Sequence, residues 1–237
     1  MSVFANLVEQ LADLLQPLFH SSAAAAAIVL FTAFVRLLVH PLSRAAARGQ
    51  KARTELQPKI AELRKKYGKN PERLQQAVLE LHTKEKVSPL AGCLPGLLQV
   101  PAFFLLYHLF SNPTIGGEAN ELLTHELLAA PLGHRWVDAL GDGGVFGAAG
   151  LVYGGLFAVV TAVAVFNYRR TKRMMAANAP VPVADGEQMP GLGAVTKVMP
   201  FMSFFTLVTV AVVPLAAALY VVTSATWSAV ERAVLYR

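Results

Sequence analysis
The chain has 237 residues, of which 54% are apolar and only 15% are charged. Soluble domains carry about 25% charged residues, so this composition argues against a soluble protein and favours a membrane protein. The formal net charge is +6, but the basic residues lie beside apolar segments rather than in one basic domain, which favours a membrane surface over DNA as the partner.

Residues 1–20 are predicted to form an external amphipathic helix in the membrane interface. Apolar side chains recur there at helical spacing: Phe4, Leu7, Val8, Leu11, Leu14, Leu15 and Leu18. Polar residues fall between them, as expected for a helix that lies on a membrane. The segment lacks Lys and Arg, so it has no basic start of a signal peptide. Pro17 is expected to end or kink the helix.

Five apolar segments follow, and we predict that each spans the membrane. Their expected bounds are 21–42, 89–110, 145–166, 198–213 and 214–231. The last two come from an uncharged run, 198–230, that is too long for one span and contains Pro214. In the third span, Gly150 and Gly154 either form a close-packing face or reflect the usual glycine content of spans. The predicted fold class is an all-α polytopic membrane protein.

Residues 43–88, between the first two spans, are predicted to form a basic helical hairpin. Leu56, Ile60, Leu63 and Tyr67 mark one helix, which Gly68 ends, and Asn70-Pro71 begins another. Residues 43–86 hold twelve Lys or Arg and five acidic residues, which suits anionic lipids and also ribosomal RNA. The positive-inside bias of membrane proteins alone is an alternative explanation for this charge.

The distribution of Lys and Arg predicts the orientation of the chain in a bacterial inner (plasma) membrane. The basic segments 43–88 and 167–197 are expected to be cytoplasmic, and the 111–144 loop, whose one Lys or Arg is Arg135, to be external. This arrangement places the N-terminus outside and the 232–237 tail in the cytoplasm.

The sequence contains no motif of an enzyme. Its six histidines lack the spacing of a metal site, and no nucleophile motif or nucleotide-binding loop is present. We therefore expect no catalytic residue, metal or cofactor.

Arg36 is the only charged residue within the apolar runs that define these spans. A charge at membrane depth is costly and usually faces a wet cavity or a partner. Arg36 lies only three residues before Val39, so its side chain could instead reach the cytoplasmic headgroups. The sequence leaves both explanations open.

Several segments resemble the YidC/Oxa/Alb family of membrane protein insertases. The most specific is the block SPLAGCLP at 88–95 with QVP at 99–101, which resembles the family's second span. The other matching segments are VRLLVHPL at 35–42, LQPKI at 56–60, KKYG at 65–68, KVMPFM at 197–202, and Pro214 followed by Leu219-Tyr220. The last span departs from the family pattern: Tyr220-Val221 and Ser224-Ala225 stand where Tyr-Trp and Ser-Asn are usual.

The resemblance implies an insertase or chaperone that helps hydrophobic segments of client proteins enter the bilayer without nucleotide hydrolysis. Arg36 would then lie in a hydrophilic, water-filled groove, formed with the second and fifth spans and open to the cytoplasm and lipid, that receives the polar flank of a client. Other candidates for the groove lining, for which ordinary helix packing is an equal explanation, are Gln99, Tyr107, Tyr220, Thr223 and Ser224. The implied partners are nascent membrane proteins and anionic lipids, with the ribosome and a Sec translocon as further candidates.

Two other functions stay open at this point. A dedicated assembly factor would bind one or two membrane proteins without inserting them. A small-solute transporter would also use an intramembrane arginine, but the sequence shows no inverted repeat to support it. Crosslinking to nascent chains would separate the three functions, because only an insertase contacts many different clients.

Overall fold

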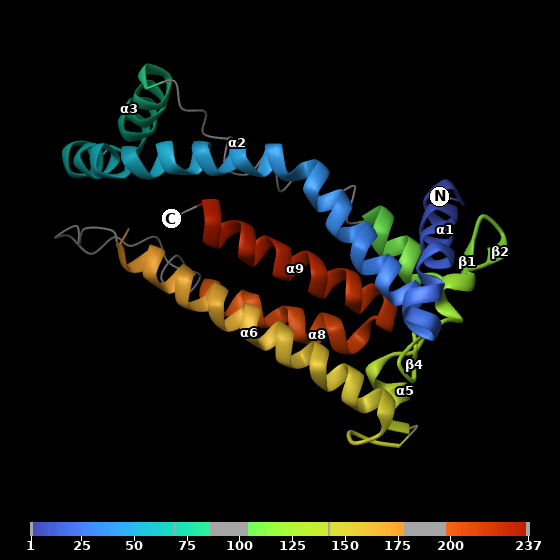
Figure 1. The fold of residues 1–237 in the computed structure, drawn as a ribbon. Coiled ribbons are helices and arrows are strands. Elements are labelled where there is room, and N and C mark those ends of the chain that lie inside the picture. The colour runs from blue at the N-terminus through green and yellow to red at the C-terminus, as the bar shows by residue number, and fades with distance from the viewer. Residues whose placement is uncertain (1, 69, 86–103, 142, 178–197, 236–237) are drawn as a thin grey trace.

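The computed structural model describes residues 2–68, 70–85, 104–141, 143–177 and 198–235. Helices dominate this part of the chain, in agreement with an all-α membrane protein. Helices α2 (Ala23–Tyr67), α6 (Ala148–Ala177), α8 (Phe205–Val212) and α9 (Leu215–Leu235) run side by side, with α9 packed against each of the other three (Figure 1).

Helix α1 (Ser2–Phe19) ends two residues after Pro17 and packs along the first part of α2. A short 3-10 helix, η1 (His20–Ser22), connects them, and His20 adopts a positive φ of 47° there. The apolar stripe of α1 divides between two surfaces. Val8 and Ala12 are buried in the core, whereas Leu14 and Leu18 are exposed. The exposed row is the part of α1 that fits the predicted contact with the membrane interface.

Helix α2 is one continuous element of 45 residues that holds both the first predicted span and the first arm of the hairpin. It contains Pro41 and Pro58, each of which lacks an N–H for the helical hydrogen-bond ladder. The helix changes direction partway along its length (Figure 1), as proline-containing helices commonly do. No helix break separates the predicted span from the arm.

Helix α3 (Pro71–Lys84) follows α2 after a short turn and packs back against it. Gly68 is the C-cap residue of α2, and Asn70 is the N-cap of α3. The Asn70 side chain accepts a hydrogen bond of 3.1 Å from the Arg73 N–H, and Pro71 occupies the first turn, where its missing N–H costs nothing. The Asn-Pro pair therefore starts this helix for the reason expected from the sequence.

The 111–144 segment contains secondary structure that the sequence analysis did not predict. Strands β1 (Thr114–Ile115) and β2 (Glu118–Ala119) pair antiparallel, and so do β3 (Glu126–Leu127) and β4 (Ala130–Pro131). Gly116 and Gly117 form the first turn, both at positive φ, which glycine adopts without strain. A 3-10 helix, η2 (Glu121–Leu123), and the short α5 (Trp136–Gly141) complete the segment. The all-α description is thus correct for the bulk of the chain but omits these two small hairpins.

The last apolar run bends at Val213-Pro214. The 3-10 helix η3 (Met199–Phe204) and α8 precede the bend, Val213 is extended, and α9 begins at Leu215. The first amides of α9 are satisfied from outside the helix: Leu215 N–H donates to the His134 carbonyl at 2.8 Å, and Ala216 N–H to the Leu132 carbonyl at 2.9 Å. The 111–144 segment therefore caps the start of α9.

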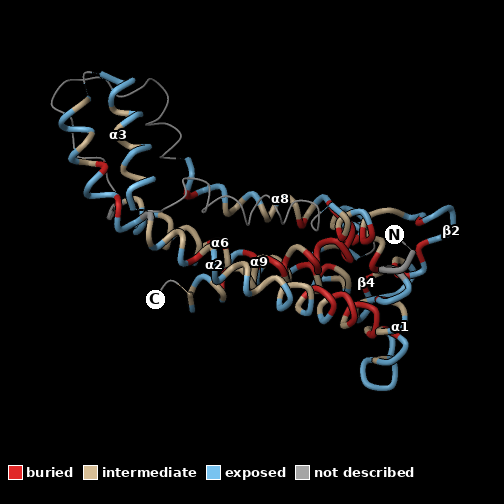
Figure 2. The backbone as a smooth tube through the Cα atoms, turned by 90° about the horizontal axis from the view of Figure 1, so that it is seen from above, coloured by how far each residue is buried: buried red, intermediate tan, exposed pale blue. Residues whose placement is uncertain are grey.

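Buried residues concentrate where α1, α2 and α9 meet the 111–144 segment, at the end opposite α3 (Figure 2). Ile28, Phe110, Leu132 and Tyr153 are among the fully buried side chains of this core. The tyrosine hydroxyl donates to the His134 carbonyl at 2.7 Å, so it does not leave an unpaired polar group inside. Towards α3 the helices are more exposed to their surroundings.

Two helical stretches of the described chain are long and apolar enough to cross a membrane by length and composition: Asn6–Tyr67, which includes most of α1 and all of α2, and Ala148–Met175 within α6. Met199–Val212 is a shorter apolar stretch. Gly154 is exposed, and apart from its own stretch of helix no described atom lies within 4 Å of where a Cβ would stand. Among the described residues, the Gly150/Gly154 pair does not form a close-packing face between helices.

Candidate functional site
Arg36 lies on α2 and points across to α9. Its Nη2 atom donates to the backbone carbonyl of Ser224 at 3.3 Å and also to the Ser224 hydroxyl. The two residues are 188 positions apart in the sequence, so this contact exists only because α2 and α9 are packed together. Arg36 itself is half-buried. A guanidinium in such a position is best accommodated when its donors meet oxygen acceptors, as they do here.

Tyr220 extends this polar contact by one turn of α9. It is 3% exposed, and it shares a hydrogen bond with the Ser224 side chain. Its ring packs against Phe110, with 6.1 Å between the ring centroids. Arg36, Ser224 and Tyr220 therefore form one connected group between two helices. Residues 220 and 224 lie on the same face of a helix, which is why a single arginine can reach this group.

The other candidates from the sequence are placed differently. Thr223 is half-buried on α9, and Tyr107 is half-buried and packed against the core. Gln99 lies outside the described residues, together with the rest of 86–103, so most of the second predicted span is not part of this description. The same holds for 178–197 of the predicted 167–197 loop.

A second polar contact between α2 and α9 was not identified from the sequence. His40 Nδ1 lies 2.5 Å from Glu231 Oε1. His40 follows Arg36 by one turn of α2, and Glu231 follows Ser224 by two turns of α9, so both contacts lie along one seam. Glu231 lies seven residues after Ser224, and this spacing was the sequence feature that could have placed both side chains on one face of the helix. Nothing in the sequence, however, paired His40 with Glu231, although the groove implied by the resemblance already grouped Arg36 with the fifth predicted span, where α9 lies.

Further charges surround this seam. Glu231 and Arg232 are both close enough to Arg36 to interact with it electrostatically, with opposite signs. Arg232 is exposed and its Nη1 donates to the Asn167 side chain of α6 at 3.4 Å. Two arginines, a histidine and a glutamate thus lie near the end of α9 where three helices meet.

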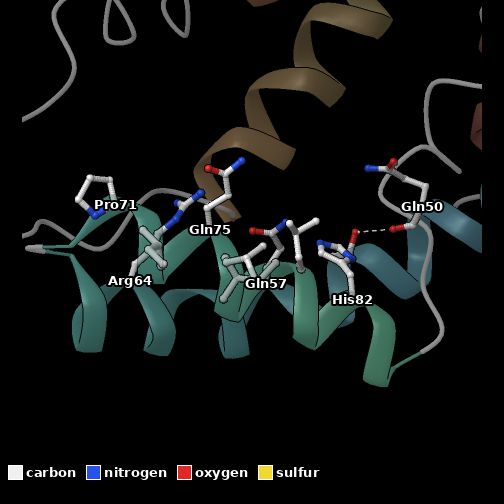
Figure 3. A pocket seen from close by; sticks show the side chains of 11 residues that line it. Gln50, Gln57, Arg64, Pro71, Gln75 and His82 are labelled. Atoms are coloured by element: carbon white, nitrogen blue, oxygen red, sulfur yellow. Dashed lines mark hydrogen bonds between the residues drawn. The ribbon is translucent and has the colours of Figure 1, made fainter.

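A groove of about 630 Å³ separates α2 from α3 in the hairpin (Figure 3). Polar side chains line much of it, including Gln50, Gln57, Arg64, Gln75 and His82 (Figure 3). Ile60 and Leu74 lie among the apolar lining residues. The groove therefore suits a partner with both apolar and hydrogen-bonding groups.

An ion pair between Lys59 of α2 and Glu85, the C-cap residue of α3, joins the two arms near the groove. The hydrogen bond from Lys59 and its positive charge lower the pKa of the Glu85 carboxyl. Both groups are solvent-accessible, so the ion pair contributes modestly to the packing of α3. Within the described residues, no group of three His, Cys, Asp or Glu side chains could hold a metal ion.

The long apolar helices and the polar seam between α2 and α9 define a helical membrane protein with a charged group held between its helices. The profile of the family described as 60Kd inner membrane protein matches residues 15–237. The chain therefore belongs to that family, and the resemblance to the YidC/Oxa/Alb insertases found in the sequence is confirmed.

Three relatives, each named Membrane protein insertase YidC, illustrate the similarity. The protein from Clostridium perfringens is 45% identical over 87 residues, which are 37% of this chain and 37% of that protein. The Oceanobacillus iheyensis protein is 41% identical over 111 residues, covering 45% of this chain and 42% of the relative. The Polynucleobacter asymbioticus protein is 38% identical over 101 residues, covering 42% and 18% respectively. The matched segments thus span less than half of each relative.

Proposed function
We propose that this chain is a membrane protein insertase or chaperone that helps hydrophobic segments of client proteins enter the bilayer. The observation that carries the proposal is the contact of Arg36 with Ser224 between α2 and α9, in a chain of the 60Kd inner membrane protein family. The name that the three relatives carry, membrane protein insertase, supports the same function.

Insertion of a client segment into the bilayer has one favourable and one costly part. Transfer of the apolar client segment into lipid is favourable by roughly 25 cal/mol per Å² of apolar surface. Its polar flank loses hydration on the way, at a cost of several kcal/mol unless other polar groups replace water. Arg36, Ser224 and Tyr220 offer such groups between the helices. No nucleotide hydrolysis is required, because the apolar transfer supplies the free energy.

We further propose the arrangement of the chain in the bacterial inner membrane. Residues 21–42, 89–110, 145–166, 198–213 and 214–231 are the five spans, residues 1–20 lie in the external interface, and the hairpin 43–88 is cytoplasmic. The bias of Lys and Arg supports this orientation. The basic hairpin meets anionic lipids and recruits clients, in cooperation with the ribosome or a Sec translocon. Gln99, Tyr107 and Thr223 complete the lining of the hydrophilic groove that contains Arg36.

Complementation tests the proposal directly. Bacterial cells depleted of their own insertase should recover insertion of a small single-span client when this chain is expressed. Protease protection of the translocated client tail is the measurement. A client that inserts spontaneously serves as the control for membrane integrity. If the chain reaches the membrane at a normal level and the dependent client stays in the cytoplasm, the proposed function is wrong.

A further inference from the structure
The contact of His40 with Glu231 brings a carboxylate into the neighbourhood of the arginine that the proposed function depends on. The Glu231 side chain is only 11% exposed, whereas that of His40 is 35% exposed. Salt and water screen a largely buried charge much less than a surface charge. The carboxylate of Glu231 therefore acts on its neighbours more strongly than an exposed glutamate would.

The neighbours of Glu231 identify the charge that it offsets. Arg36 interacts electrostatically with both Glu231 and Arg232. Arg232, however, is exposed and hydrogen bonded to Asn167 of α6, so its charge is better screened. On the described part of the chain, Glu231 is thus the buried charge of opposite sign beside Arg36.

We propose that Glu231 determines client specificity: its carboxylate offsets part of the positive charge of Arg36 and so limits how strongly the seam between α2 and α9 favours acidic client segments. This inference rests on the insertase function proposed above. His40 is a positioning residue, since its ring holds the carboxylate against α2. An acidic client residue passing the seam is attracted by Arg36 and repelled by Glu231, whereas a neutral residue experiences neither force.

The consequence is a defined response to loss of this single charge. Glu231→Gln keeps the shape of the side chain and a hydrogen-bonding group for His40 but removes the negative charge. The positive potential beside Arg36 then rises, so insertion of acidic client segments increases while insertion of neutral segments does not. Glu231→Asp keeps the charge and should keep the selectivity. Glu62→Gln removes the same charge from an exposed position of α2 and is the matched control.

The test uses the full-length purified chain in vesicles of phosphatidylethanolamine and phosphatidylglycerol. Two single-span clients share one apolar segment and carry a translocated tail with either three Asp or three Asn residues. The ratio of acidic to neutral client inserted, measured by protease protection, should rise about threefold to tenfold in Glu231→Gln. Glu231→Asp and Glu62→Gln should keep the ratio of the wild type.

Each other outcome is decisive. An unchanged ratio in Glu231→Gln, with both clients inserted by the wild type, overturns the role of Glu231 and leaves the insertase function standing. An equal rise in Glu62→Gln also overturns it, because the effect would then follow net charge alone. Proportional loss of both clients in Glu231→Gln would make Glu231 a structural residue only. Failure of the wild type to insert either client overturns both proposals.

Discussion
The side chain of Arg36 crosses from α2 to α9 and meets both the carbonyl and the hydroxyl of Ser224. Arg36→Ala removes the charge, so insertion of clients with acidic tails should fall strongly, while neutral clients are affected less. Arg36→Lys should retain much of the activity, since an ammonium group still holds water and positive charge. The measurement is protease protection of both clients at matched expression. Equal insertion of acidic and neutral clients by Arg36→Ala and wild type would remove Arg36 from the mechanism.

Ser224 offers a finer test of the same contact. Ser224→Ala deletes the hydroxyl but keeps the backbone carbonyl that also accepts a hydrogen bond from Arg36. The substitution should therefore remove only part of the contact and lower the free energy of unfolding by about 1 kcal/mol. Thr223→Ala removes a hydroxyl from the neighbouring position, which points to a different side of α9, and is the control. Melting of the detergent-solubilised protein measures both. A larger loss in Thr223→Ala than in Ser224→Ala would show that the Arg36 contact is not what stabilises this part of the seam.

At this scale the resemblance grouped Arg36, Tyr220 and Ser224 as lining of one groove, but the sequence did not indicate which side chains are in contact. Arg36 stood out because a charge within an apolar run is rare, and Tyr220 and Ser224 were candidates through the family resemblance. The pairing of His40 with Glu231 joins positions 191 residues apart, and it depends on the rotation of two helices about their axes. One sequence does not contain that information.

The hairpin is the element in which pH dependence can be predicted. The pKa of Glu85 is lowered from 4.5 by Lys59, so the ion pair stabilises the packing of α3 fully above pH 4.5, and this contribution is lost as the pH falls through the lowered value. Spin labels on α2 and α3 should report wider separation of the arms under acidic conditions. Lys59→Gln should separate the arms partly already at neutral pH and weaken this response. Lys65→Gln, at an exposed position, should behave like the wild type.

A separation of the arms that is independent of pH in the wild type would contradict this prediction. The comparison is informative because α3 contains no buried residue. Its packing therefore depends on few contacts, and removal of one ion pair is measurable.

Helix boundaries with strong local signals were predictable, and long-range features were not. The Asn70-Pro71 start of α3 and the break at Pro214 follow from backbone chemistry within a few residues. The strands of the 111–144 segment are two residues long, too short to show the alternation that predicts a strand. The continuity of α2 was not predicted either: the sequence analysis treated 21–42 and 43–88 as separate segments, whereas one helix runs through both Pro41 and Pro58.

The proposed topology places the termini and loops of the whole molecule on two sides of a membrane, and labelling can assign those sides. With Cys93, the single cysteine, replaced by serine, a cysteine at Ser111 should react with an impermeant maleimide added from outside the inner membrane. A cysteine at Thr83 of α3 should react only after the membrane is opened. The reason is the excess of Lys and Arg around α3. The reverse labelling pattern would show that the orientation is inverted.

The continuity of α2 has a mechanical consequence. A helix of 45 residues is roughly 68 Å long, more than twice the ~30 Å of the hydrocarbon layer. In the proposed topology, a load on the arm of the hairpin is therefore transmitted as a bending moment to the part of α2 inside the bilayer. Pro41 interrupts the hydrogen-bond ladder, so bending should concentrate there. Since Pro41 adjoins His40 and lies near Arg36, binding of a client to the arm would, under the proposed function, also bend α2 beside its contacts with α9.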